Sequence, residues 1–240
     1  MKYFPAVIDN FFDKPDLVRE FALSLDYAPD DKGRWPGQRS ESLHMIDYEL
    51  YMSVMLKIMS IYTDFAYTNV TWENASLYFH KIKDTGDKEL NKGWIHIDQD
   101  FQLAGLCYLN PGVNDMNLGT SIYSKKGFHQ KFERHHYKHM YYKGEQINMN
   151  DYKKKLSEHN NEYDETIKIG NVYNRMITYE TLEHHTLNGI PKDEERLTML
   201  LFMDGIKPED NRFPNNRIKD VKQYDSFIEE RIRFLNEHKK

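Results

Sequence analysis

The stretch WIHIDQDFQLAGLCYLNP, residues 94–111, places a polar motif directly before an apolar segment. Residues 102–109 are mostly apolar or aromatic and end at an Asn-Pro-Gly turn, a pattern typical of a buried strand. Ahead of them, His96 and Asp98 are separated by one residue. Residues i and i+2 of an extended segment point to the same face. The stretch therefore predicts an imidazole and a carboxylate side by side at the start of a β-rich core.

Short β-branched or aromatic segments recur along the chain and predict further strands. They cover residues 66–73, 75–82, 119–123, 171–179 and 196–203. Apolar residues at helical spacing come before these segments, over residues 14–26 and 41–62. Two helices followed by many strands predict a mainly β fold with flanking helices.

The order of these segments predicts one domain over residues 1–240. Helical support takes up residues 1–65, the strand-rich core residues 66–205, and a closing helix residues 220–238. Residues 124–170 interrupt the strands and are rich in Lys, His, Tyr and Asn. An insertion of this length predicts a lid or a binding loop, with a short helix at 151–159.

Composition excludes several classes of function. The 240 residues include 33 basic and 38 acidic side chains, a formal net charge of −5, so there is no general positive field for nucleic acid. No apolar run approaches the roughly 18 residues of a membrane span, and the first residues lack the pattern of a signal peptide. Cys107 is the single cysteine, which suits a reducing compartment. We expect a cytoplasmic protein, and a homodimer is compatible with the sequence.

A second group of polar residues follows the strands. His184 and His185 are adjacent, and Arg196 opens an apolar segment 11 residues after His185. Two imidazoles and one carboxylate are the ligands of the 2-His-1-carboxylate triad, which binds non-haem Fe(II) and leaves other coordination positions open. A His-x-Asp motif alone is weakly diagnostic, because most such pairs are surface residues. The distal histidine and the arginine strengthen the interpretation as a metal site.

With these residues in this order, residues 72–204 resemble the 2-oxoglutarate- and Fe(II)-dependent dioxygenases, in particular their prolyl-4-hydroxylase-like branch. The resemblance implies a double-stranded β-helix, a jelly-roll, cupin-like core, buttressed by the N-terminal helices. It implies that Fe(II) is held by His96, Asp98 and His185. It further implies that 2-oxoglutarate is bound by Arg196, Thr198, Tyr108 and Asn110. An arginine offers the far carboxylate of this cosubstrate a planar, bidentate fork that a lysine does not.

The same resemblance implies a hydroxylase that uses O2 and converts 2-oxoglutarate to succinate and CO2. Its substrate would be a small molecule or a peptidyl side chain. Two other functions fit the same residues. One is a non-catalytic jelly-roll binding or assembly protein with a vestigial metal site, and the other is a cupin-like metalloenzyme that does not use 2-oxoglutarate.

Two assignments have alternatives. His184 and His185 point to opposite faces of a strand, so only one faces the metal. His185 is favoured because its spacing to Tyr179 and Arg196 fits the dioxygenases that the chain resembles. Arg175 is the alternative to Arg196, although its position before the distal histidine favours a structural role.

The insertion at 124–170 carries two further patterns. Its histidines could form a second metal site, since two of them have helical i, i+4 spacing, although a solvated lid is the more common meaning; they are His129, His135, His136 and His139. Its basic residues could attract an acidic substrate or only keep the loop soluble; they are Lys125, Lys126, Lys131, Arg134 and Lys138.

Overall fold

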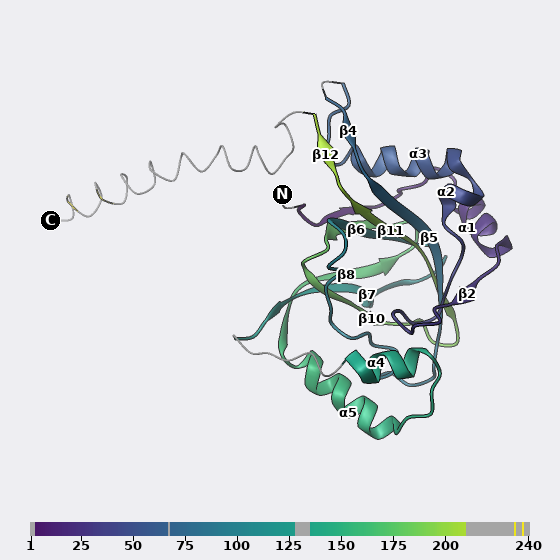
Figure 1. Cartoon of the computed structure of the whole chain (residues 1–240), viewed down its shortest axis with the longest axis vertical. Helices are drawn as coiled ribbons and strands as arrows, with labels where there is room; N and C mark the ends of the chain where they lie inside the picture. Colours follow the sequence, from purple (N-terminus) through teal and green to yellow (C-terminus); the bar gives the residue numbers. More distant parts are fainter. Residues whose placement is uncertain (1–2, 67, 128–134, 210–232, 234–236, 238–240) are drawn as a thin grey trace.

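Two antiparallel sheets form the centre of the molecule (Figure 1). The computed structural model describes residues 3–66, 68–127, 135–209, 233 and 237. The strands are β1 (Ala6–Ile8), β2 (Ala28–Pro29), β3 (Gln38–Arg39), β4 (Val70–Thr71), β5 (Asn74–Lys83), β6 (Leu103–Tyr108), β7 (Asn114–Lys125), β8 (Tyr163–Val172), β9 (Met176–Glu180), β10 (His184–Gly189), β11 (Glu195–Asp204) and β12 (Lys207–Pro208). The helices are α1 (Pro15–Ser24), α2 (Leu43–Ile46), α3 (Tyr48–Met59), α4 (His135–Tyr142) and α5 (Met149–Asn160).

The larger sheet has the order β1-β9-β6-β11-β5-β3-β2, and the smaller one the order β10-β7-β8. A short pair, β12-β4, lies apart from both. The apolar core between the two larger sheets includes Leu106 and Leu200 from one and Ile122 and Ile169 from the other. This is the predicted double-stranded β-helix of jelly-roll type, and the predicted mainly β fold with flanking helices is confirmed.

The outer face of the larger sheet packs against the N-terminal helices. Helix α3 buries an apolar stripe that includes Val54, Met55 and Ile58. Strand β11 supplies Leu197 and Leu201 to the same core. Successive residues of a strand face opposite sides, so β11 contributes to the helix-side core and to the core between the sheets in alternation.

The helix predicted over residues 41–62 is two helices, α2 and α3. Asp47 separates them because it has an extended backbone, with φ −150° and ψ 92°. Its carboxylate accepts a hydrogen bond from the Leu50 N–H at 2.9 Å, which caps the start of α3. The prediction for residues 14–26 agrees with α1.

The strand predicted over residues 171–179 is also two elements, the end of β8 and all of β9. Asn174 has a left-handed φ of 62°, and its side-chain amide bonds both the N–H and the C=O of Phe12, each at 2.8 Å. A strand cannot continue through this turn. The segment predicted at 66–73 yields only β4, and the sequence patterns missed β1, β2, β3 and β10.

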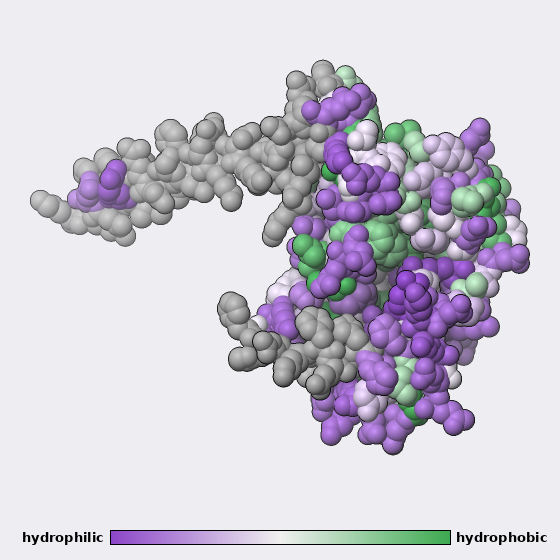
Figure 2. Space-filling view, in the orientation of Figure 1, coloured by the Kyte–Doolittle hydropathy of each residue, from purple (hydrophilic) through white to green (hydrophobic). Residues whose placement is uncertain are grey.

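The insertion is more regular than predicted. The helix expected at 151–159 is α5, but α4 precedes it, and β8 begins at Tyr163 and pairs with β7 as far as Lys125. Hydrophilic residues predominate over the part of the surface that holds α4 and α5, at the bottom of Figure 2. The helix predicted at 220–238 lies outside the described residues, apart from Arg233 and Glu237. Within the described ranges, no helix combines the length and the apolar character needed to span a bilayer.

Candidate metal centre

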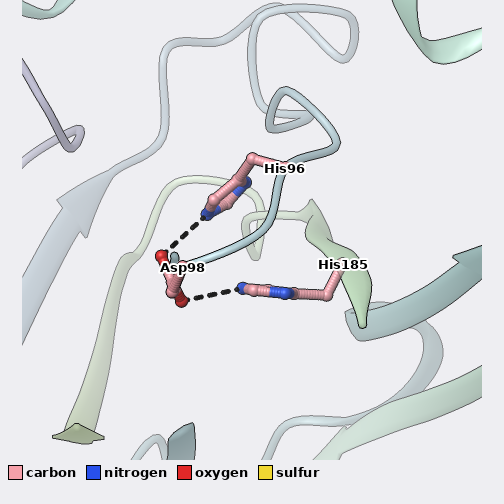
Figure 3. A group of neighbouring side chains, drawn as sticks. All are labelled: His96, Asp98 and His185. Carbon is pink, nitrogen blue, oxygen red and sulfur yellow. Dashed lines mark ion pairs between the residues drawn. The ribbon is translucent and has the colours of Figure 1, made fainter. Parts of the chain in front are cut away.

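Three side chains from two segments converge beside the core (Figure 3). His96 and Asp98 precede β6, and His185 lies on β10. The segments are joined by two main-chain hydrogen bonds, from the His96 N–H to the His185 C=O at 3.1 Å and back at 2.9 Å. One ligand atom from each of the three side chains lies within 4.8 Å of the other two. The structure therefore brings together the three residues expected to hold Fe(II).

Backbone carbonyls fix the orientation of both imidazoles. The Nδ1 of His96 lies 2.7 Å from the Trp94 C=O, and the Nδ1 of His185 lies 2.8 Å from the Glu183 C=O. A carbonyl oxygen only accepts, so each Nδ1 donates its proton, and in the neutral imidazole Nε2 is then the atom that carries the lone pair. The two Nε2 atoms face the Asp98 carboxylate at 3.8 and 3.3 Å.

The ionisation of these groups suits metal binding. Burial lowers the pKa of His96 to about 3, and the nearby charges of Lys138 and His185 act in the same direction. Burial alone would raise the pKa of Asp98, but the hydrogen bond and the charge of His185 outweigh it and lower that pKa to about 2. A neutral imidazole and an ionised carboxylate are the forms that coordinate metals. In these forms the two Nε2 atoms and the Asp98 carboxylate offer three ligand atoms to one cation.

A cavity of about 990 Å³ opens beside the triad. Its walls include Trp94, Phe101 and Tyr179, whose rings exclude water from part of the site. Arg196 also lines it, is only 3% exposed, and has an Nε with no hydrogen-bond partner among the described residues. A buried N–H group without an acceptor is costly, so this wall is suited to an anion.

Thr198 lies two residues after Arg196 on β11 and faces the same side of the strand. Its buried hydroxyl also has no partner within the described part of the chain. Tyr108 is fully buried, donates to Thr120 Oγ1 at 3.0 Å, and has its ring 5.5 Å from the Arg196 guanidinium carbon. Arg196, Thr198 and Tyr108 therefore form one polar cluster inside the barrel.

Asn110, like Tyr108 and Thr198, is not among the residues that line the cavity, and its contact with 2-oxoglutarate stays a prediction. Its amide bonds the main chain of β11, donating to the Glu195 C=O at 2.8 Å and accepting from the Leu197 N–H at 2.7 Å. Strand β6 ends at Tyr108, and Asn110 lies just before the turn at residues 111–112. This residue ties the turn to the neighbouring strand.

The alternative residues point elsewhere. The His184 ring packs against Tyr163, with ring centroids 4.9 Å apart, and belongs to no described metal-binding group. Arg175 is bound by the Asp9 carboxylate, at 2.6 Å from its Nε and 2.8 Å from its Nη2. The position of Arg175 is thus explained by a surface ion pair.

The insertion shows no second metal site among its described residues. His129 lies outside the described ranges, and the side chain of His135 is not described. His136 is exposed, and His139 Nδ1 contacts the Gly33 C=O at 2.8 Å. The last contact docks α4 on the loop before β3.

Two basic residues at the cavity were not identified as site residues from the sequence. Arg39 ends β3, and Lys138 lies in α4. Only the general basic character of the insertion pointed to Lys138, and no local pattern pointed to Arg39. Both side chains come near the triad because elements that are far apart in the sequence pack together.

The fold and the His-Asp-His group define a double-stranded β-helix protein with a candidate metal centre. Among solved structures, EvdO2 from Micromonospora carbonacea var. aurantiaca aligns with a TM-score of 0.50 at 9% identity, over 85% of this chain and 87% of that one. HygX from Streptomyces hygroscopicus, with nickel and 2-oxoglutarate bound, aligns with a TM-score of 0.49 at 12% identity, over 83% and 82%. A prolyl-4-hydroxylase from Pseudomonas putida aligns with a TM-score of 0.46 at 13% identity, over 83% and 91%.

At such identities the similarity to EvdO2 concerns the fold. The chain belongs to the family of unknown function DUF6445, whose sequence profile matches residues 5–197. No curated protein matches the sequence. The family assignment covers the three triad residues and Arg196 but carries no activity.

Proposed function

We propose that this protein is an Fe(II)- and 2-oxoglutarate-dependent dioxygenase of the prolyl-4-hydroxylase-like type. It would hydroxylate a C–H bond of a small molecule or a peptidyl side chain and convert 2-oxoglutarate to succinate and CO2. One observation carries the proposal: the Nε2 atoms of His96 and His185 and the carboxylate of Asp98 face one another, with both Nδ1 atoms bound to backbone carbonyls.

The triad residues would hold Fe(II), which when bound supplies the chemistry that activates O2. Three protein ligands leave positions for the cosubstrate and for O2. The Trp94 and Glu183 carbonyls keep each imidazole in the tautomer that presents Nε2. Such outer partners also strengthen metal binding by orienting the ligands.

Arg196 and Thr198 would bind the far carboxylate of 2-oxoglutarate. The guanidinium and the hydroxyl are both buried and lack protein acceptors for Arg196 Nε and Thr198 Oγ1. A carboxylate accepts from both and neutralises the buried charge. Tyr108 would hold the guanidinium in place through its ring.

The insertion would cover the substrate side of the cavity. Lys138 and Tyr142 from α4 and His159 from α5 belong to its lining. Helices that close an active site exclude water from the reaction. This supports the role of lid or binding element expected for residues 124–170.

The test is the visible charge-transfer band of the chelate, measured anaerobically after adding Fe(II) and 2-oxoglutarate to the purified chain. We expect the band in the wild type and in the matched control His184→Ala, and no band in His96→Ala. Arg196→Met should raise the 2-oxoglutarate concentration needed for half of the band by about tenfold or more, because a charge-assisted bond is lost. Succinate release in air should follow the same order.

Each alternative gives a different result. A folded wild type that binds Fe(II) but shows neither band nor succinate release would contradict the proposal and favour a binding protein. Oxidation that is independent of 2-oxoglutarate and unaffected by Arg196→Met would favour the cupin-like metalloenzyme.

A further inference from the structure

Two basic side chains in the cavity have no role in the site described so far. Arg39 comes from β3, and Lys138 from α4. Lys138 is only 8% exposed, and the Nε of Arg39 is buried without a hydrogen-bond partner in the described part of the chain. Neither side chain forms an ion pair with a described residue. Buried cations without acidic partners are rare in proteins.

Aromatic rings lie close to the Arg39 guanidinium. Its central carbon lies 4.0 Å from the ring centroid of Trp35 and 5.4 Å from that of Phe202. The Phe202 ring in turn lies 5.0 Å from that of Phe101. Rings that pack near a guanidinium accept no strong hydrogen bonds from it, so its N–H groups stay available to an anion. The neighbouring rings add an apolar surface beside them.

Lys138 reaches the same cavity because α4 docks on the loop that carries Trp35. The contact is made by His139 Nδ1 and the Gly33 C=O, 2.8 Å apart. Burial lowers the pKa of Lys138 to about 8 and that of Arg39 to about 10, and the Asp98 charge opposes both shifts. Both side chains therefore carry a positive charge at neutral pH and lie within electrostatic range of the triad.

The charges of the proposed site leave these two cations unbalanced. A divalent ion with Asp98 keeps one positive charge, and Arg196 adds a second. The two carboxylates of 2-oxoglutarate cancel these charges. Two other acidic residues line the cavity, Asp100 and Glu162, but Asp100 is exposed and neither is paired with Arg39 or Lys138. Arg39 and Lys138 are therefore left without a direct acidic partner among the described residues, and an anion in the cavity would supply one.

We propose that Arg39 and Lys138 bind an anionic group of the substrate, a carboxylate or a phosphate, and that Trp35 and Phe202 contact a planar or apolar part next to it. This inference rests on the proposed function, because it assigns the substrate to the cavity beside the iron. It narrows the substrate from any small molecule or peptidyl side chain to an acidic one.

The test uses three matched probes, 1-naphthoate, 1-naphthyl phosphate and neutral 1-naphthamide, titrated calorimetrically into the metal-free full chain. Both anions should bind at least about tenfold more tightly than the amide, since charge-assisted hydrogen bonds are lost with it. The tighter anion identifies the group. Arg39→Met and Lys138→Met should each weaken the binding of the preferred anion by about tenfold. The control Lys154→Met removes an exposed charge from α5 and should change nothing.

Equal affinities for the amide and the anions would overturn the inference, and so would folded Arg39→Met and Lys138→Met variants that bind like the wild type. If either variant fails to fold, Arg39→Gln and Lys138→Gln serve in its place, and increasing salt should weaken anion binding to the wild type. The anions must still bind the Arg196→Met variant, because loss there would assign them to the cosubstrate site. The probes can bind without a metal. Anion binding by a protein that shows no charge-transfer band would therefore reject the proposed function but not the binding of an anion by Arg39 and Lys138.

Discussion

The two faces of strand β11 differ in what they contact. One face places Leu197, Met199 and Leu201 in the core shared with the helices. The other places Arg196 and Thr198 in the barrel, with buried polar atoms that have no partner among the described residues. A packed apolar face contributes stability, whereas unpaired polar atoms reduce it. The comparison indicates that the inner face is arranged for ligands and the outer face for folding.

The largest expected effect is on the outer face. Leu201→Ala should lower the free energy of unfolding by about 2–5 kcal/mol, because a fully buried side chain leaves a cavity. Denaturant titration measures this. The matched control is the neighbour Leu200→Ala, whose side chain already borders the open cavity and should cost less. Equal losses for the two variants would contradict the difference between the faces.

A second prediction concerns how α5 positions the triad. Asn160 accepts from the Ile95 N–H at 3.1 Å and donates to the Gly93 C=O at 3.0 Å, on either side of the Trp94 carbonyl that orients His96. Asn160→Ala should weaken metal affinity by about tenfold or more, as loss of outer-shell support does. Competition with a chelating dye measures the affinity. Ser157→Ala, an exposed change on the same helix, is the control, and equal affinities for the two variants would refute this role.

The neighbouring strand β5 should also make stability depend on pH, because its residue His80 pairs with Thr198 and lines the cavity. Burial, assisted by the charge of Arg39, lowers the pKa of His80 well below its ordinary value of 6.5. The folded protein keeps His80 neutral while the unfolded chain takes up a proton, so stability is full above pH 6.5 and falls as the pH drops below it. The loss approaches about 1.4 kcal/mol per pH unit. His80→Gln should reduce this slope by the share of one proton in unfolding measured between pH 7 and 5, while His96, whose pKa is also lowered by burial, keeps its own share. An unchanged slope would refute the contribution of His80.

The smallest effect is expected at Thr198. Thr198→Val removes the unpaired hydroxyl and keeps the volume, so the free energy of unfolding should not fall. The affinity for 2-oxoglutarate should decrease about fivefold, the value of one neutral hydrogen bond. Band titration measures the affinity, and thermal unfolding provides the stability control. A variant that loses stability and retains full affinity would reverse the interpretation of this face.

Much of the fold could be predicted because the signals are local. The alternation and length of β5, β6 and β11 follow from runs of apolar residues, and α1 follows from its Pro-Asp start and apolar spacing. The errors lie where a side chain far away decides the backbone. Asn174 turns the chain between β8 and β9 while bound to Phe12, and no pattern within residues 171–179 contains that partner.

For the candidate site, too, local patterns predicted some features and distant contacts decided the others. The i, i+2 spacing of His96 and Asp98 predicted a shared direction, and the order of His185 and Arg196 predicted their companions. The hydrogen bonds of Asn110 could not be predicted, because its partners are main-chain atoms of another strand. The choice between His184 and His185 depended on which face of β10 meets the His96 segment, and pairing decides that.

The sequence alone determined many of the strands, the two helical supports and the shared direction of His96 and Asp98, because these depend on neighbours within a few residues. Tertiary structure decided that Arg39 and Lys138 share a cavity with the triad, and which polar atoms remain unpaired there. Which side chains share a cavity depends on how sheets and helices that are far apart in the sequence pack together. That packing is determined by the burial of the whole core and not by any short segment.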